Sequence, residues 1–379
     1  MKPALRKPLL AFHLWTGIIA GLVLIVVALS GCVLIFRAQF ERRLDPQRFI
    51  VKGDGPRRSL DQLAVAATAA HPAGTLESVR LFGDPTMPVM YLFSNKEYVH
   101  VDPHTGAILG TRQRYGEGFG WVEGIHKYLT LEPSLGENVN GGLAFVFAFL
   151  FATGAILWIP ATRKALVAGL TLNRKLKGRP WNLNLHKTIG AYAALILAFS
   201  AMSGIPIALE STRVVIDFVT GSKKLPPVSR PAVGTGSFIG FQAVEDRIEK
   251  LMPGATETYI ALPKNGIVSS YAIAAQAPHP SARSYVLLDA ATGKVLRFTP
   301  FENAPIGFRA YYWLLALHTA VAGGTLVKIL LVFATLSVPV LYFTGLASYI
   351  KRRFLKPAAR TAVRTAKPSP EPVQVKSGV

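Results

Sequence analysis

Residues 13–32 read HLWTGIIAGLVLIVVALSGC, and the interpretation of this stretch decides the fold. It ends in Leu-Ser-Gly-Cys, a pattern typical of a bacterial lipoprotein signal, yet it begins with His13 at the start of a long apolar run. The run continues to Phe36, whereas the apolar part of a signal peptide spans only about 7–15 residues. We therefore expect a membrane helix that is retained in the mature protein and in which His13 has a functional role.

The composition of the chain indicates a membrane protein. Of 379 residues, 50% are hydrophobic and 17% charged, and the mean hydropathy is +0.34, which is more apolar than a soluble domain. The net charge of +21 comes from Lys and Arg clustered beside apolar runs, as the positive-inside bias requires. We therefore expect a lipid bilayer and no nucleic acid as partner. The single cysteine, Cys32, excludes an intramolecular disulfide and multi-cysteine metal sites.

Four apolar stretches reach the length of about 20 residues that a membrane-spanning helix needs. They are Leu9–Phe36, Gly141–Pro160, Thr188–Leu209 and Ile329–Ile350. The basic clusters place both termini and the 161–182 loop in the cytoplasm, with 37–140 and 210–310 outside. Ala310–Val327 is also apolar, but a fifth span would put the cluster 351–353 outside, so we expect an outer-surface helix there, broken at 323–324.

The chain repeats itself at fixed offsets. The paired motifs are H-x-x-x-G at His13 and His186, S-G at Ser30 and Ser203, W-x-x-x-x-H at Trp121 and Trp313, and T-G at Thr153 and Thr344. The outer segments repeat as well. The first has an amphipathic stretch at 60–70, alternating β-like runs at 89–93 and 98–101, and a D-x-x-T-G turn at 102–106. The second has the same features at 241–251, 269–274, 285–288 and 289–293. The unit is thus a helix, a small α+β domain and a helix, made twice, in parallel repeats about an axis along the membrane normal.

Four histidines fall on the repeated helices as two equivalent pairs. His13 and His186 lie at the cytoplasmic ends of their spans, whereas His126 and His318 lie on the outer side. The 17 residues from His13 to Ser30 correspond to about 26 Å of helix, so the pairs belong near opposite membrane faces. One such histidine is equally well explained by an interfacial hydrogen bond. Four that pair by repeat symmetry are harder to explain in that way.

Two facing imidazoles at one depth suit axial ligation of haem iron. Gly17 and Gly190, one turn after the inner pair, leave room for a flat macrocycle beside the backbone. Zinc is the rival metal, but it prefers four ligands, or three and water. We therefore predict two bis-histidine haem b groups, and no built-in nucleotide module because the G-x-G-x-x-G signature is absent.

Aromatic residues before the outer histidines predict a pocket for an electron acceptor. We expect it to be lined by Tyr115, Trp121, Tyr311 and Trp313, although an interfacial aromatic belt explains any one of them as well. For the remaining histidines, His71, His100, His104 and His279, we expect a solvated surface role.

With these motifs in place, the chain resembles the PepSY-associated transmembrane family over roughly residues 8–352. The resemblance is carried by His13 with Ser30-Gly31, by D-x-x-T-G in both outer segments, by Leu185-His186-Lys187 with Ser203-Gly204, and by Leu317-His318 with Thr344-Gly345. Within the family, the size and pattern are most similar to FoxB-type ferric-siderophore reductases. The second unit departs from the first because His318 precedes its Gly-Gly pair by only 5 residues, against 15 for His126.

The resemblance implies an α-helical integral membrane protein with four transmembrane helices, two periplasmic α+β PepSY-like domains and an internal duplication. It implies the bacterial inner membrane, haem ligands at His13, His126, His186 and His318, reduction of a ferrioxamine-like ferric siderophore, and an external cytoplasmic or membrane electron donor. Two alternatives stay open: a haem protein serving another acceptor such as a quinone, and a non-enzymatic PepSY regulator or assembly factor.

The expected organisation divides the chain into nine segments. These are the cytoplasmic N-terminus 1–8, transmembrane helix 9–36, PepSY-like domain 37–120, outer ligand helix and transmembrane helix 121–160, basic cytoplasmic loop 161–183, transmembrane helix 184–209, PepSY-like domain 210–307, outer ligand helix and transmembrane helix 308–350, and a disordered cytoplasmic tail 351–379.

Overall fold

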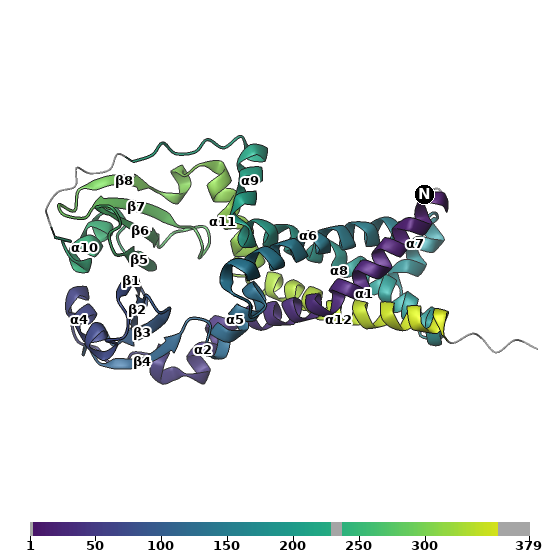
Figure 1. The fold of residues 1–379 in the computed structure, drawn as a ribbon, viewed down its shortest axis with the longest axis horizontal. Helices are drawn as coiled ribbons and strands as arrows, with labels where there is room; N and C mark the ends of the chain where they lie inside the picture. The colour runs from purple at the N-terminus through teal and green to yellow at the C-terminus, as the bar shows by residue number, and fades with distance from the viewer. Residues whose placement is uncertain (1–2, 229–236, 355–379) are drawn as a thin grey trace, which may run out of the picture.

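Four long apolar helices form a bundle at one end of the molecule (Figure 1). The computed structural model describes residues 3–228 and 237–354, so most of the predicted tail lies outside the described residues. The bundle helices are α1 (Pro3–Leu34), α6 (Pro133–Trp158), α8 (Gly178–Ala208) and α12 (Gly324–Arg353). All four are long and apolar enough to cross a membrane. The prediction of four spans is therefore confirmed, although α8 begins ten residues earlier than the apolar run at Thr188.

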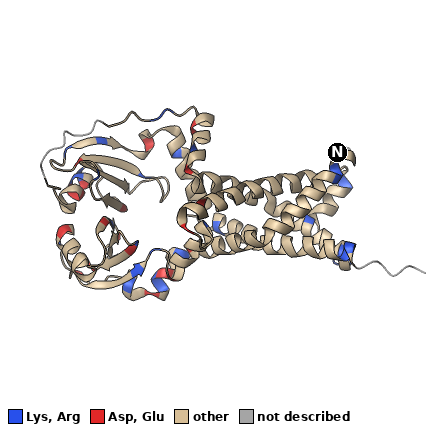
Figure 2. Cartoon of the chain, in the orientation of Figure 1, with Lys and Arg blue, Asp and Glu red and all other residues tan. Residues whose placement is uncertain are grey.

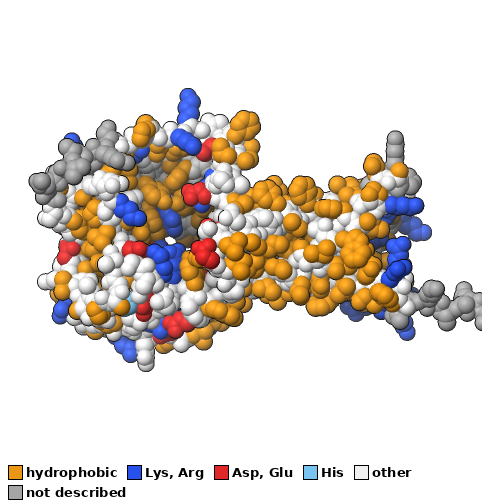
Figure 3. Space-filling view, viewed as in Figure 1, with side chains coloured by type: hydrophobic (Ala, Val, Ile, Leu, Met, Phe, Trp, Pro, Cys, Tyr) orange, Lys and Arg blue, Asp and Glu red, His pale blue; other side chains and the backbone are white. Residues whose placement is uncertain are grey.

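The surface of the bundle is that of a lipid-facing protein. Large apolar side chains point outward from its helices; Leu195, for example, is 81% exposed and Ile19 75% exposed. Figure 3 shows hydrophobic side chains covering the bundle, and Figure 2 shows Lys and Arg gathered at its end remote from the sheet. The short helix α7 (Arg163–Leu170) joins α6 to α8 at that end. The chain is thus a multi-pass membrane protein with one basic end.

Two short helices lie where the bundle meets the outer region. They are α5 (Gly118–Tyr128), which packs on α1 and α6, and α11 (Ile306–His318), which packs on α8 and α9 (Arg213–Thr220). The helix expected over Ala310–Val327 instead ends at His318, because Ala320 and Gly323 adopt left-handed backbone angles (φ 57° and 82°) that stop it. The chain then turns into α12, whose first residue is Gly324. The Gly-Gly pair is therefore a turn between two helices.

The outer region contains one antiparallel sheet of eight strands, to which each repeat contributes four. The strands are β1 (Leu76–Phe82), β2 (Val89–Phe93), β3 (Glu97–Val101), β4 (Ile108–Gln113), β5 (Glu257–Ala261), β6 (Ile267–Ile273), β7 (Ser284–Asp289) and β8 (Val295–Thr299). Their order is β4-β3-β2-β1-β5-β6-β7-β8. The repeats meet at β1 and β5, where Ser78 pairs with Ala261 and Phe82 with Glu257.

One face of the sheet carries the hydrophobic core of the outer region. The helices α4 (Leu60–Ala70) and α10 (Phe241–Leu251) have the predicted bounds and cover alternate strand residues such as Val79, Ile260 and Val286, all fully buried. The opposite face is flanked by α3 (Pro46–Phe49), which follows α2 (Arg37–Leu44), and by α11. The short 3₁₀ turns Glu210–Thr212 and Phe301–Asn303 complete the described elements.

Both D-x-x-T-G motifs form the predicted turns between strands. The Asp102 carboxylate accepts backbone N–H bonds from His104 at 2.8 Å and Thr105 at 3.0 Å, and Asp289 does the same for its own repeat at 3.0 and 2.8 Å. The closing glycine of the first motif has φ of 77°, a conformation that glycine adopts without strain. The internal duplication predicted from sequence is therefore present in the local structure of both halves.

Candidate cofactor site: two facing histidine pairs

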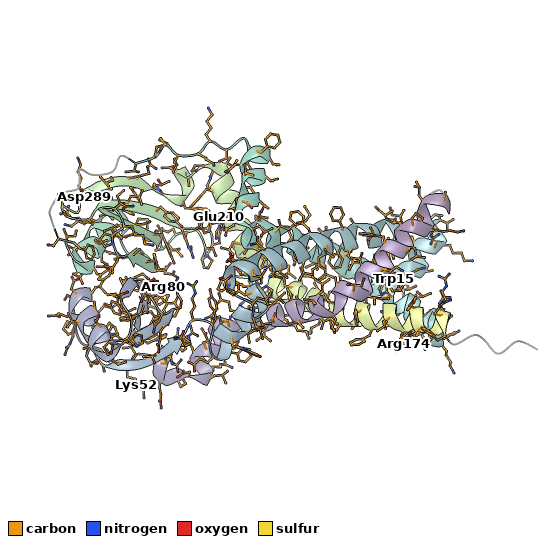
Figure 4. All side chains as sticks on the ribbon, in the orientation of Figure 1. Trp15, Lys52, Arg80, Arg174, Glu210 and Asp289 are labelled. Atoms are coloured by element: carbon orange, nitrogen blue, oxygen red, sulfur yellow. The ribbon has the colours of Figure 1, made fainter. Side chains whose placement is uncertain are left out.

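The inner pair joins the first and third membrane helices. His13 on α1 and His186 on α8 have ring centroids 6.3 Å apart, with the rings perpendicular at 90°. Both helices reach the basic end of the bundle (Figures 1 and 2), and Trp15 and Arg174, labelled in Figure 4, mark this end. The two repeats thus place equivalent histidines face to face, as their sequence positions predict.

The outer pair joins the two short helices at the opposite end of the bundle. His126 on α5 and His318 on α11 also have ring centroids 6.3 Å apart, with the rings tilted at 52°. The unequal spacing from each histidine to its following Gly-Gly pair does not disturb this match, because α6 begins at Pro133 whereas α12 begins at Gly324. Gly141-Gly142 lies inside α6, beyond its first two turns, whereas Gly323-Gly324 forms the turn into α12, so the two Gly-Gly pairs are not equivalent positions.

Each inner histidine is held through Nδ1 by a buried Thr-Gly dipeptide of its own repeat. Nδ1 of His13 lies 3.0 Å from Thr153 Oγ1 on α6. Nδ1 of His186 lies 2.9 Å from the Leu341 carbonyl oxygen and 3.2 Å from Thr344 Oγ1 on α12. The T-G motifs of the sequence repeat are therefore the supports of the inner histidines.

The outer histidines are held in the same way by Ser-Gly dipeptides. Nδ1 of His126 lies 2.9 Å from the Val27 carbonyl oxygen and 3.3 Å from Ser30 Oγ on α1. Nδ1 of His318 lies 2.9 Å from Ser203 Oγ on α8. We call the four dipeptides the histidine seats: Ser30-Gly31, Thr153-Gly154, Ser203-Gly204 and Thr344-Gly345.

The seats fix which nitrogen of each ring carries the proton. The seat hydroxyls donate to carbonyls one turn earlier, for example Ser203 to Phe199 at 2.7 Å and Thr344 to Val340 at 2.6 Å. Because each hydroxyl hydrogen is used in this way, the hydroxyl oxygen accepts from Nδ1–H of the histidine. Nε2 is then left with a lone pair, and within residues 3–228 and 237–354 no hydrogen bond reaches Nε2 of these four rings.

The seat glycines bring the rings close to the partner helices. A Cβ built on Gly31 would lie 2.9 Å from Cε1 of His126, and one on Gly154 would lie 3.0 Å from Cε1 of His13. The corresponding distances at Gly204 and Gly345 are 3.5 and 3.4 Å. Sequence reasoning found these dipeptides as repeat markers but missed their contact with the histidines.

The spacing within each pair fits a single metal ion between two Nε2 atoms. Two metal–imidazole bonds of about 2 Å put ring centroids roughly 6 Å apart, whereas a direct hydrogen bond between the rings brings them to about 5 Å. In the described part of the chain, no group of three or more His, Cys, Asp or Glu is placed to hold a metal ion. The donor set is thus two neutral imidazoles at each depth, which suits an iron whose other ligands come from a macrocycle.

Comparison with known proteins assigns the family. Residues 10–352 match the PepSY-associated TM region. The chain belongs to this family. No curated protein matches the sequence. All four histidines and all four seats of this PepSY-associated TM protein lie inside the matched range, so the paired arrangement is part of the family region.

The four aromatic residues predicted to line an acceptor pocket lie in different surroundings in this PepSY-associated TM protein. The Tyr115 hydroxyl contacts the Tyr128 hydroxyl at 3.2 Å, and Tyr311 accepts from Arg213, whose guanidinium lies 4.2 Å from its ring. Trp313 borders a cavity of about 390 Å³ with Phe301, Ile306 and Arg309. Trp121 is 53% exposed. A single pocket lined by all four residues therefore stays a prediction.

The prediction of a solvated surface role is wrong for two histidines of the outer region. His100 is fully buried, because Phe49 of α3 packs edge-on against its ring with centroids 5.2 Å apart. Burial, reinforced by the charges of Arg112 and Arg48, lowers the pKa of His100 to about 3. His279 is 3% exposed and contacts Trp313. Both are neutral core residues at physiological pH.

Proposed function

We propose that this PepSY-associated TM protein is an inner-membrane di-haem b reductase that passes electrons across the bilayer to ferric siderophores and so releases iron. One observation carries the proposal. Four seated histidines form two facing pairs with equal centroid spacings of 6.3 Å, and every Nδ1 is hydrogen-bonded to a seat.

The proposed orientation follows from charge. Lys and Arg concentrate at the bundle end remote from the sheet (Figure 2), and basic residues remain on the cytoplasmic side of membranes. We place the histidines His13 and His186 near the cytoplasm and the sheet in the periplasm. Residues 37–120 and 210–307 are then the two periplasmic domains.

The chain's own residues would hold the haem groups and tune them. Nε2 of His13 and His186 would bind one haem iron, and Nε2 of His126 and His318 the other. Haem, once bound, supplies a one-electron carrier at each depth. The seats orient each imidazole and increase its electron donation through the Nδ1–H bond, which is the usual part of outer-shell groups in metal sites.

The separation of the two depths supports a transmembrane route. His186 and the seat residue Ser203 lie on one helix, 17 residues apart, which corresponds to about 26 Å. An external donor on the cytoplasmic side, such as a flavoprotein or a membrane quinol, would supply the electrons. In the overall reaction the donor loses one electron and the chelated Fe(III) becomes Fe(II), which siderophores hold far less tightly.

The test is the absorbance spectrum of the purified protein, with haem quantified per chain by the pyridine haemochrome method. We expect about two haem b per chain, falling to about one in His186→Ala and in His318→Ala. Dithionite-reduced protein mixed with a ferric siderophore under argon should then reoxidise, with Fe(II) trapped by ferrozine. Protein without haem contradicts the proposal. If the reduced haem reoxidises with a quinone but with no ferric chelate, the result favours a quinone as the electron acceptor.

A further inference from the structure

The sheet face opposite the hydrophobic core presents a row of residues directed away from α4 and α10. Strand pairing places Arg80 on β1 opposite Tyr259 on β5, and carries the row on to Tyr271 on β6 and Tyr285 on β7. Residues on this face alternate with the core residues Val79 and Ile260, which pair with each other. Arg80 thus lies at the junction of the two repeats, followed by one tyrosine on each of the next three strands.

The tyrosines connect this row to the helix that carries an outer histidine. The rings of Tyr259 and Tyr271 stack with centroids 5.2 Å apart and planes 14° apart, and Tyr285 follows at 6.0 Å from Tyr271. The Tyr285 hydroxyl lies 3.0 Å from that of Tyr312 on α11, six residues before His318. This face of the sheet is therefore linked through Tyr312 to the helix that carries His318, about 9 Å along its axis from that histidine.

Positive charge in this region exceeds its negative charge. Arg283 lies over two tyrosine rings, 4.2 Å from the centroid of Tyr271 and 5.5 Å from that of Tyr312, and within the described residues it forms no ion pair. Arg80 meets a single carboxylate, Glu257, at 3.6 Å, and its Nε is buried without a hydrogen-bond partner. The same carboxylate accepts from the Tyr271 hydroxyl at 2.8 Å.

The tyrosines do not balance this charge. Tyr271 is 5% exposed and Tyr312 6% exposed, and burial raises the pKa of both phenols above the ordinary value. They are neutral donors at physiological pH. Their ring faces, which otherwise attract cations, are already occupied by Arg283. A cationic ligand would therefore meet rings that Arg283 already covers, whereas an anion would meet the guanidinium N–H donors of Arg80 and Arg283.

A recess lies beside the junction of the two repeats. Figure 3 shows the molecule hollowed between the sheet and the helix bundle, with Lys and Arg side chains inside the hollow and Asp and Glu side chains at its border with the bundle. Figure 4 labels Arg80 at the edge of the same space, where the two halves of the sheet meet. Low-dielectric walls focus the field of like charges in such a recess.

We propose that the ferric chelate taken by this protein is anionic, with its carboxylate, catecholate or hydroxycarboxylate oxygens bound by Arg80 and Arg283. This inference rests on the proposed function and names the substrate class of the same site. Guanidinium groups match planar oxyanions bidentately. In the reaction, the chelated Fe(III) would gain the one electron that the external donor loses, with the haem groups held by the histidines as the electron carrier, and no covalent bond would form or break.

The test compares ferric chelates that share one iron-binding unit and differ in the charge of a terminal substituent. Ferrioxamine B carries one positive charge on its amine, its N-acetyl derivative is neutral, and its N-succinyl derivative carries one negative charge, while the iron coordination is unchanged. Dithionite-reduced haem protein in detergent, freed of excess dithionite, is mixed with each chelate in a stopped-flow instrument. We expect the second-order reoxidation rate to be about tenfold or more faster for the succinyl than for the amine form at low ionic strength, with the ratio falling as salt is added.

A double variant and a matched control locate the effect. Arg80→Gln with Arg283→Gln should reduce the rate ratio between the succinyl and amine forms to within about threefold. Lys294→Gln removes an exposed charge from the turn beside Asp289, which Figure 4 labels at the far edge of the sheet, and should leave the ratio unchanged.

The outcomes separate this inference from the function on which it rests. Equal rates for the three chelates in the native protein, or a faster rate for the cationic form, would overturn the inference that the substrate is anionic. The proposed ferric-chelate reductase activity would still stand. Haem that none of the chelates reoxidises overturns the proposed function itself. Since the native protein alone gives this answer, the conclusion does not depend on whether the double variant folds.

Discussion

Adding one methyl group to a seat glycine should release the outer haem when the glycine belongs to the first repeat but not when it belongs to the second. In Gly31→Ala the new Cβ would lie 2.9 Å from Cε1 of His126, closer than carbon atoms pack without displacement. In the equivalent Gly204→Ala the distance to Cε1 of His318 is 3.5 Å, an ordinary van der Waals contact. The two changes are chemically identical and act on the same pair from opposite sides.

The His126 ring cannot retreat freely from the added methyl group. Its Nδ1 is held at 2.9 Å by the Val27 carbonyl and at 3.3 Å by Ser30 Oγ, and its backbone carbonyl accepts from Asn140 at 2.7 Å. Restoring an ordinary contact requires a ring shift of about half an ångström, which lengthens these bonds. Disturbing the outer-shell support of a metal ligand typically costs about 10–100-fold in affinity, and we expect that loss for the outer haem in Gly31→Ala.

Gly204→Ala should keep its haem and gain stability. Glycine inside a helix is about 0.5–1 kcal/mol less favourable than alanine, and no contact opposes the methyl group at this position. Haem per chain, measured by the pyridine haemochrome method after dialysis against apomyoglobin, should fall toward one in Gly31→Ala and stay near two in Gly204→Ala. Electron paramagnetic resonance of the ferric protein identifies which low-spin signal is lost.

Two results would refute this reasoning about the seats. Equal haem loss in both variants would mean that the glycines serve general helix packing. Full retention in Gly31→Ala would mean that the His126 ring is not confined by its seat. The inner pair supplies a second comparison, because the contact is 3.0 Å at Gly154 and 3.4 Å at Gly345.

Two further predictions concern hydrogen bonding and pH. Ser203→Ala removes the hydroxyl at 2.9 Å from His318 Nδ1 and should raise the outer haem midpoint potential by about 40 mV, for a bond worth about 1 kcal/mol. Ser30→Ala should shift it less, because its hydroxyl lies farther from His126 Nδ1, at 3.3 Å, and the Val27 carbonyl remains at 2.9 Å; potentiometric titration distinguishes the two. Burial lowers the pKa of His100 to about 3 in the folded protein, against about 6.5 in the unfolded chain. Below pH 6.5 the unfolded chain therefore binds a proton at His100 that the folded protein does not, and the free energy of unfolding falls by about 2 kcal/mol between pH 7.5 and 5. His100→Leu should therefore flatten the fall of the melting temperature between pH 7.5 and 5, and a fall as steep as in the native protein would contradict the assignment.

Periodicity and repetition in the sequence predicted most local structure. The amphipathic helices α4 and α10 have their expected bounds, because each buries one apolar stripe on the same sheet. The joining of the two halves into one sheet was not predicted, since the pairing of Arg80 with Tyr259 links strands about 180 residues apart and leaves no local signal. The row of arginine and tyrosine depends on this register and was missed for the same reason.

Repeat symmetry also predicted which histidines meet, but not what holds them. Equivalent positions in parallel repeats lie at equal depth, which is sufficient to pair His13 with His186. The seats depend on how neighbouring helices cross, and this is set by side-chain packing along their whole length. The error at His100 has a similar origin, because its burial depends on Phe49, 51 residues earlier in the chain.

The two repeats are alike at the histidine seats but differ on the sheet face where the electron acceptor is proposed to bind. Each repeat holds its own histidines on its own seats, and each pair forms only across the junction between repeats, so neither half completes a site alone. Two equal axial ligands require that symmetry. On the sheet, by contrast, the paired residues Tyr259 and Tyr271 of the second repeat correspond by register to Ser78 and Leu92 of the first. A recess that binds one acceptor near one outer histidine has no need of a second copy, which accounts for the loss of symmetry there while the seats keep it.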